Sequence, residues 1–295
     1  MRPTDHDERM ARAQLALDGI SVGDSFGERF FAQPDTAAAR IAARLMPPAP
    51  WSWTDDTAMA LSVVEVLAAR GTIDPYLLAD AFARRYEADP RRGYGGGAHV
   101  ILQSIVDGTP WIEAAHSVFD GLGSMGNGGG MRVAPVGGYF AGDLSRVIEE
   151  ARASALPTHA HPDGQAGAIA VAVAASLAAS QVAPSTLLER VYAATPDGPT
   201  RDVLAKARLL PLTADVQAAV ELLGNGSQVC ACDTVPFALW CAARHLDGFE
   251  EAMWTTVAGL GDRDTTCAIV GGIVALSVGA GGIPPAFLAA REPLA

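Results

Sequence analysis

Segments with apolar residues at helical spacing follow one another along the chain, and this pattern limits the fold more than any other feature. The clearest runs from 55 to 70, with Thr54 before it and Gly71 after it. A polar N-cap, acids in the first turn, a periodic apolar face and a terminal glycine predict a helix there. Strand alternation with hairpin turns is nearly absent, which predicts an all-α fold. Similar helices are expected near 10–20, 74–88, 97–107, 143–155, 165–181, 185–194, 200–208, 214–223, 234–246, 249–259, 265–279 and 285–291.

Composition favours one compact domain over residues 1–295. The chain is 49% apolar, 18% charged and only 6% aromatic. This is ample for a large core, and abundant small residues suit closely packed helices. Because no repeat, charge block or low-complexity linker divides the chain, we expect a single helical bundle.

Charge and hydropathy exclude other classes. Acids outnumber bases 33 to 21, giving a net charge of −12, whereas sequence-independent nucleic-acid binding needs a basic face. The amino terminus is too charged for a signal peptide, so a cytoplasmic location is expected. Uncharged stretches at 164–188 and 268–290 are long enough to span a bilayer but lack flanking basic residues and aromatic belts. We interpret them as buried core helices and expect no membrane contact.

Four cysteines stand in the last quarter of the chain: Cys230, Cys232, Cys241 and Cys267. The first two lack zinc-finger spacing, and no histidines lie nearby in the sequence. We expect all four to be small apolar residues in a reduced interior.

Two glycine-rich segments, 91–99 and 121–132, each lead into an apolar helical segment. Flexible linkers are one interpretation of such runs. The other is a nest of free backbone N–H groups before a helix, which suits phosphate oxygens. Neither segment matches the Walker or dinucleotide-binding pattern.

Acidic residues cluster at two expected helix starts, Thr54-Asp55-Asp56 and Asp262-Arg263-Asp264-Thr265, with a weaker cluster at Gly23-Asp24-Ser25. The helix dipole favours acids at such positions, so helix capping explains any one cluster. Capping does not explain paired carboxylates with a small hydroxyl residue occurring twice. Oxygen donors of this kind suit hard cations, whereas zinc would favour Cys or His. The two clusters together predict a site for a pair of hard divalent cations such as Mg²⁺.

The segment Thr158-His159-Ala160-His161-Pro162 holds two histidines that cannot share one helix face before a proline. We expect His159 to contact a ligand, whereas His161 is as well explained by packing.

Taken in order, six segments resemble the ADP-ribosylglycohydrolases, and order and spacing agree from about residue 11 to 280. They are GDSFG (23–27), WTDDT (53–57), RGYG (92–95), GNGGGMR (126–132), TH (158–159) and GDRDTT (261–266). The resemblance implies an all-α orthogonal bundle, usually monomeric, with two Mg²⁺ or Mn²⁺ ions in a cleft.

The resemblance also implies roles for single residues. The metal ligands would be Thr54, Asp55, Asp56, Asp262, Asp264 and Thr265. Substrate contacts would come from Gly93, Tyr94, Gly95 and Gly97 in one loop, from Ser124, Gly126, Asn127, Gly128, Gly129 and Met131 in the other, and from His159. Two departures stand out: Met125 replaces an aromatic residue of some relatives, and Phe30-Phe31 occupies the stretch of a flexible acidic residue, with Glu28 nearby.

The implied reaction is hydrolysis of an N- or O-glycosidic bond at C1″ of the distal ribose, with ADP-ribose released from arginine or serine. Its transition state resembles an oxocarbenium ion, and Asp56 or Asp264, if not fully engaged by metal, is the expected base that takes the proton of water. Asp55 is the third expected catalytic residue. ADP-ribose 1″-phosphate and ADP-ribosylated nucleic-acid ends are alternative substrates. A non-catalytic, crystallin-like relative would have lost metal ligands, but all six positions are filled. The sequence leaves the linkage, the target and the choice between Mg²⁺ and Mn²⁺ open.

Overall fold

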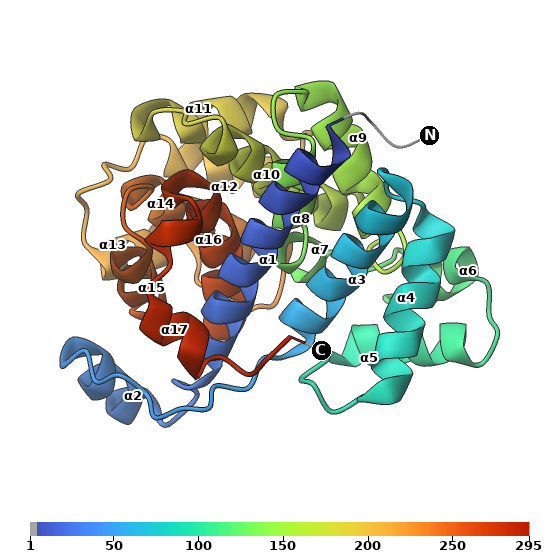
Figure 1. Cartoon of the computed structure of the whole chain (residues 1–295), viewed down its shortest axis with the longest axis horizontal. Coiled ribbons are helices and arrows are strands. Elements are labelled where there is room, and N and C mark those ends of the chain that lie inside the picture. Colours follow the sequence, from blue (N-terminus) through green and yellow to red (C-terminus); the bar gives the residue numbers. More distant parts are fainter. Residues whose placement is uncertain (1–4, 295) are drawn as a thin grey trace.

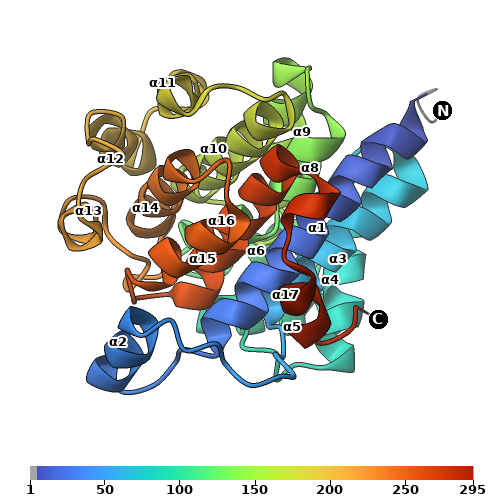
Figure 2. The ribbon, with the colours of Figure 1, turned by 60° about the vertical axis from the view of Figure 1, so that its left-hand side comes forward.

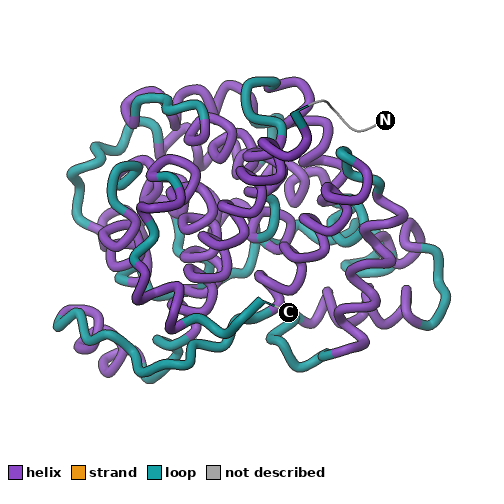
Figure 3. The backbone as a smooth tube through the Cα atoms, in the orientation of Figure 1, coloured by secondary structure: helices purple, strands orange, loops and turns teal. Residues whose placement is uncertain are grey.

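The computed structural model describes residues 5–294, and within this range the chain forms seventeen α-helices, one short 3₁₀ helix and no strand (Figure 3). The expected all-α fold is confirmed. The helices are α1 (His6–Glu28), α2 (Pro34–Ala42), α3 (Asp55–Arg70), α4 (Pro75–Ala88), α5 (Gly96–Val106), α6 (Trp111–His116), α7 (Gly128–Met131), α8 (Ala134–Tyr139), α9 (Leu144–Ala155), α10 (Pro162–Ala179), α11 (Pro184–Ala194), α12 (Pro199–Ala207), α13 (Val216–Leu223), α14 (Ala231–Arg244), α15 (Phe249–Val257), α16 (Arg263–Val278), η1 (Ala280–Gly282) and α17 (Pro285–Ala290).

Every helix expected from the sequence is present, and all but the first agree within about three residues at each end; the first, expected near 10–20, extends over His6–Glu28. Helix α3 begins directly after Thr54 and ends at Gly71, which takes the left-handed conformation (φ 71°) typical of a helix stop. Helices α2, α6, α7 and α8 were not predicted. The last three have six residues or fewer, too short to show a helical period, and α7 contains three consecutive glycines. Tertiary packing rather than propensity holds such helices.

Helices α1 and α16 run side by side through the middle of the molecule, with α3 on the other side of α1 (Figures 1 and 2). Helices α4, α5 and α6 gather beyond α3, whereas α11 to α15 lie on the side of α16. The two central helices come from opposite ends of the chain. Their packing therefore brings residues near position 24 close to residues near position 264.

Glycines make this close packing possible. A β-carbon on Gly19, Gly23 or Gly27 of α1 would stand 2.0–2.2 Å from a carbonyl oxygen of α16. No real β-carbon approaches an oxygen so closely, so only glycine allows the two backbones to touch. These glycines follow one another every four residues, which places them on one face of α1.

The two uncharged stretches, 164–188 and 268–290, are buried where they form α10 and most of α16, whereas 181–186 and most of 277–286 are half-buried or exposed. Fifteen of the eighteen residues of α10 are buried, and α16 is buried over most of its length. Among the described residues, no helix is both long and apolar enough to cross a bilayer. One apolar cluster takes in residues from α1 through α17. The single domain over 1–295 stays a prediction, and residues 1–4 and 295 lie outside the described part.

Candidate functional site

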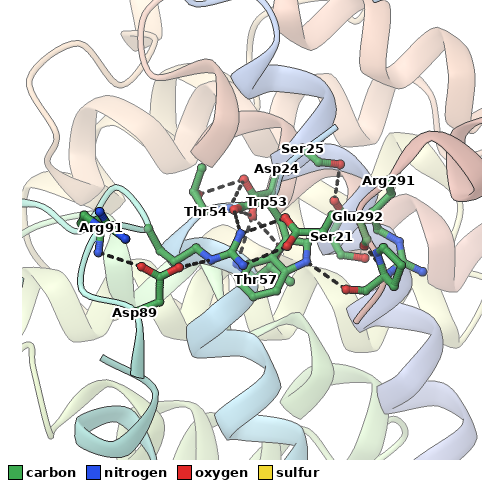
Figure 4. A network of polar contacts seen from close by, with 12 residues as sticks. Ser21, Asp24, Ser25, Trp53, Thr54, Thr57, Asp89, Arg91, Arg291 and Glu292 are labelled. Carbon is green, nitrogen blue, oxygen red and sulfur yellow. Dashed lines mark hydrogen bonds and ion pairs between the residues drawn. The ribbon is translucent and has the colours of Figure 1, made fainter. Parts of the chain in front are cut away.

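The first acid group is held in place by a carboxylate from another helix. Asp24 of α1 is fully buried, and it accepts hydrogen bonds from the backbone N–H groups of Thr54 (2.9 Å) and Thr57 (3.1 Å). It also accepts from both threonine hydroxyls, at 2.9 and 2.5 Å (Figure 4). Asp24 thus caps α3 from outside. Thr54 does occupy the predicted N-cap position, but its own side chain does not cap the helix.

Asp56 is the most enclosed acid of this group. Its side chain is 1% exposed, and one carboxylate oxygen, Oδ2, accepts from the Thr54 hydroxyl at 3.1 Å. The other, Oδ1, is buried with no hydrogen-bond partner among the described residues. A buried carboxylate oxygen without a partner costs about 1–3 kcal/mol or more, so this atom suits a cation as its partner.

The second acid group stands at the start of α16. Asp262 precedes the helix and accepts a 2.6 Å hydrogen bond from the Asn127 side-chain amide, while Asp264 accepts from the backbone N–H of Thr265 at 2.8 Å. Arg263 between them points elsewhere, because its guanidinium donates to the Phe30 carbonyl at 2.6 Å. Although Arg263 stands between Asp262 and Asp264 in the sequence, neither carboxylate therefore has a charge partner within this segment.

Residues from both helix starts line one pocket of about 650 Å³, although Asp55 and Asp56 are not among them. Thr54 comes from the first group, and Asp262 and Asp264 from the second. The remaining lining residues are Glu28, Phe31, Ser52, Trp53, Asp89, Arg91, Arg92 and Gly93. Asp55 faces the same region, since a β-carbon on Gly93 would lie 3.5 Å from its Oδ1 atom. The structure thus brings together the two groups that stand some 200 residues apart in the sequence.

The carboxylates of this pocket repel one another. Burial, followed by the charge of Asp24, raises the pKa of Asp55 to about 7 and the pKa of Asp56 well above its usual value. Burial and Asp262 raise the pKa of Asp264 in the same way, and burial raises that of Asp24 to about 6. Such shifts arise where the protein itself supplies too little positive charge.

The donor set suits a hard cation, since it consists of carboxylate and threonine oxygens, one of them unpartnered. In the described range, no three His, Cys, Asp or Glu side chains converge tightly enough to form a ready cation site. The donors instead lie on two sides of the pocket, one group at each helix start.

The first glycine loop leads from the pocket wall into α5. Gly93 takes a positive φ of 89°, whereas Gly95 has φ −65°, so only the former needs glycine for its backbone. Open space surrounds Gly95 and Gly96, where a β-carbon would meet nothing within 4 Å. A β-carbon on Gly97 would lie 3.4 Å from the Phe119 ring. The loop therefore exposes backbone for a ligand to approach.

Tyr94 does not share this exposure. It is 5% exposed and packs edge-on against Tyr86 and His99, with its hydroxyl buried and unpartnered among the described residues. Burial raises its pKa above the usual range.

The second glycine loop surrounds His159. A β-carbon on Gly126 or Gly128 would stand 3.4 or 3.1 Å from the imidazole. His159 is 7% exposed, its Nδ1 atom lies 2.8 Å from the Thr158 hydroxyl, and burial lowers its pKa to about 3. It is therefore a neutral imidazole. His161 instead accepts from the backbone N–H of Asp163, at the start of α10.

Of the remaining residues predicted in this loop, Ser124 is half-buried, whereas Asn127, Gly129 and Met131 are buried. Ser124 accepts from the backbone N–H of Gly126 at 3.1 Å, and Asn127 ties the loop to the second acid group. Gly129 and Met131 are buried in α7, and a β-carbon on Gly129 would meet α10. Substrate contact by these residues stays a prediction.

The cysteines are free, but the expectation of four buried thiols is wrong for two of them. Cys241 and Cys267 are buried, whereas Cys230 and Cys232 are half-buried with their sulfurs 3.2 Å apart. The reason is their place at the surface start of α14, beside Gly126.

Sequence reasoning did not assign several residues that the structure places at the site. Asp24 was treated as a weak cluster, Glu28 was left without a role, and Asp89, Arg91 and Arg92 were not singled out as ligands or lining. The four-residue glycine spacing on α1 is the signal that could have placed Asp24 against α16.

The fold and pocket together define a helical protein with an acidic, oxygen-lined cleft between the starts of two helices. The family model of ADP-ribosylglycohydrolase matches residues 5–293. The chain belongs to this family of glycohydrolases.

Relatives agree with this assignment. The chain is 29% identical to ADP-ribosylhydrolase ARH3 of Homo sapiens over 322 residues, which cover 94% of this chain and 88% of the relative. It is 30% identical to ADP-ribosylhydrolase ARH3 of Gallus gallus over 269 residues, covering 80% and 72%. A solved structure described as an ADP-ribosylglycohydrolase-related protein complex superimposes with a TM-score of 0.69, at 26% identity and with 97% and 94% of the two chains covered.

Proposed function

We propose that the protein hydrolyses the glycosidic bond between a modified target and the distal ribose of ADP-ribose, and that two Mg²⁺ or Mn²⁺ ions take part. One observation carries the proposal: Thr54 of the first acid group lines the same pocket as Asp262 and Asp264, which stand about 200 residues later in the sequence. Family membership supports the ADP-ribosyl substrate, and the unpartnered Asp56 oxygen supports a bound cation.

The ligands would be Thr54, Asp55 and Asp56 on one side and Asp262, Asp264 and Thr265 on the other. When bound, divalent ions lower the pKa of water and stabilise negative charge on oxygen. Asp24 keeps Thr54 in place from behind, and Asn127 does the same for Asp262.

The chain's own groups then account for binding and proton transfer. The exposed backbone at Gly95 and Gly96 can approach a diphosphate without a basic patch, which suits a chain of net charge −12. A carboxylate among Asp55, Asp56 and Asp264 would accept the proton of the attacking water. Positive charge develops on the ribose in the transition state, so water attacks the ribose readily and needs only a base to take its proton.

A panel of substrates tests the proposal. Purified protein is incubated with ADP-ribosyl-arginine, ADP-ribosyl-serine and ADP-ribose 1″-phosphate, with Mg²⁺, with Mn²⁺ and with excess EDTA. We expect release of ADP-ribose from at least one substrate with metal and none in EDTA. Full activity in EDTA would refute the role of the ions, and no release from any substrate would refute the reaction.

A further inference from the structure

The last residues of the described chain lie against the segment that leads into the first acid group (Figure 4). Trp51 donates its backbone N–H to the Ala290 carbonyl at 2.7 Å, and Glu292 donates its own to the Trp51 carbonyl at 2.8 Å. The indole N–H of Trp53 donates to the Pro293 carbonyl at 3.4 Å. The carboxyl-terminal tail is therefore fixed beside the entrance to α3.

Arg92 joins this tail to the pocket wall. Its guanidinium forms a two-pronged ion pair with the Glu292 carboxylate, at 2.8 and 2.9 Å, and donates to the Trp53 carbonyl at 3.1 Å. The guanidinium carbon lies 3.7 Å from the centre of the Trp53 ring, and the Nε atom lies 3.2 Å from the Asp89 carboxylate. A planar cation held on one face and along one edge has a single orientation.

This orientation sets the spacing between two walls of the pocket. Trp53 directly precedes Thr54, the first residue of the first acid group, and Arg92 directly precedes Gly93, which faces Asp55. Because Arg92 binds the Trp53 carbonyl, it holds the start of α3 and the glycine loop at a fixed separation. Glu292 does not line the pocket itself, so its effect passes through Arg92.

We propose that Glu292 is a positioning residue of the acid pocket, which orients Arg92 and thereby fixes the first acid group against the glycine loop. Each partner stabilises the charge of the other: the ion pair lowers the pKa of Glu292 and raises that of Arg92. Without the Glu292 carboxylate, Arg92 keeps Asp89 and the Trp53 ring but loses the prong that aligns it with the Trp53 carbonyl. The part concerning metal and turnover rests on the proposed function.

The test compares Glu292→Gln with a matched control, Glu251→Gln. Glu251 also forms a two-pronged pair with an arginine distant in the sequence, Arg44, at 2.6 and 2.5 Å, but this pair lies on the exposed surface outside the pocket lining. Backbone hydrogen exchange is measured in EDTA for segments 52–58 and 92–97, and Mn²⁺ affinity by calorimetry. A charged hydrogen bond of about 1.5–3 kcal/mol corresponds to a change of about tenfold or more.

We expect Glu292→Gln to speed exchange in both segments and to weaken Mn²⁺ binding by about tenfold, with Glu251→Gln at the wild-type value in both measurements. Arg92→Lys, which keeps the charge but loses the two prongs, should have the same effect, and the double variant should add little. Wild-type exchange in both segments of Glu292→Gln would overturn the proposal, whatever its melting temperature. Failure of the wild-type protein to bind Mn²⁺ would instead refute the proposed function, because exchange in EDTA needs no metal.

Discussion

At the scale of single residues, the acid pocket holds more negative charge than the chain itself balances. Replacing one of these carboxylates should therefore separate function from stability. In Asp56→Asn we expect hydrolysis to fall by about a thousandfold, because a proposed metal ligand and a proposed proton acceptor are lost. The melting temperature in EDTA should stay equal to that of the wild type or rise, since a buried carboxylate that its neighbours repel has been removed.

Asp163→Asn provides the control for this experiment. Asp163 is equally buried but lies away from the pocket lining, where it accepts from the backbone N–H and hydroxyl of Thr200. That variant should melt earlier and keep its turnover. If Asp56→Asn instead melts earlier and retains its hydrolysis, Asp56 is a structural residue only.

His159 gives a pH dependence at the same scale. Burial lowers its pKa from 6.5 to about 3, so the folded protein binds this proton more weakly than the unfolded chain does. The stability from His159 is therefore complete above pH 6.5 and is lost as the pH falls towards 3. Near pH 5 the loss should be about 2 kcal/mol in the free energy of unfolding.

Denaturant unfolding at a series of pH values measures this effect. The difference between wild type and His159→Gln should shrink as the pH falls below 6.5. Parallel curves for wild type and His159→Gln would show that the imidazole is not held neutral by burial.

At the scale of the elements, the packing of α1 on α16 decides where the two acid groups meet. A methyl group on Gly23 would stand 2.0 Å from the Cys267 carbonyl oxygen, so Gly23→Ala must separate the helices. We expect a loss of about 3 kcal/mol in the free energy of unfolding. Gly281→Ala is the control, because a β-carbon there meets nothing within 4 Å. Equal stability of the two variants would mean that the backbones do not touch.

The same elements show which features of the structure could be predicted from the sequence. The helix at 55–70 was predictable because its cap, periodic face and terminal glycine all lie within the segment. The role of Asp24 was not predictable, because its four hydrogen bonds connect to residues about thirty positions away and no local sequence pattern indicates them. Arg92 and Glu292 are 200 positions apart, so their pairing depends on the whole fold. Local sequence patterns thus predict the helices and the types of ligand residue. The contacts that hold those residues in place come from distant elements and are visible only in the packed structure.

At the scale of the whole molecule, the pocket is lined by residues from early and late in the chain, from Glu28 to Asp264, and the segment beyond α17 pairs with Trp51 beside it. A ligand that bridges these segments binds only the folded state and should stabilise the molecule as a unit. The expected product, ADP-ribose, carries a distal ribose for the acid groups and a diphosphate for the glycine loops. AMP has the adenosine and one phosphate but lacks that ribose.

We therefore expect ADP-ribose with Mg²⁺ to raise the melting temperature and AMP to raise it far less. At a hundredfold excess over its dissociation constant, a ligand of the folded state adds about 2.7 kcal/mol to the free energy of unfolding. Differential scanning fluorimetry with each nucleotide, with Mg²⁺ and with EDTA, measures this. Because the distal ribose should contact the ions, EDTA should reduce the shift from ADP-ribose towards that from AMP. Equal shifts from the two nucleotides in Mg²⁺ would show that the distal ribose makes no contact with the acid groups.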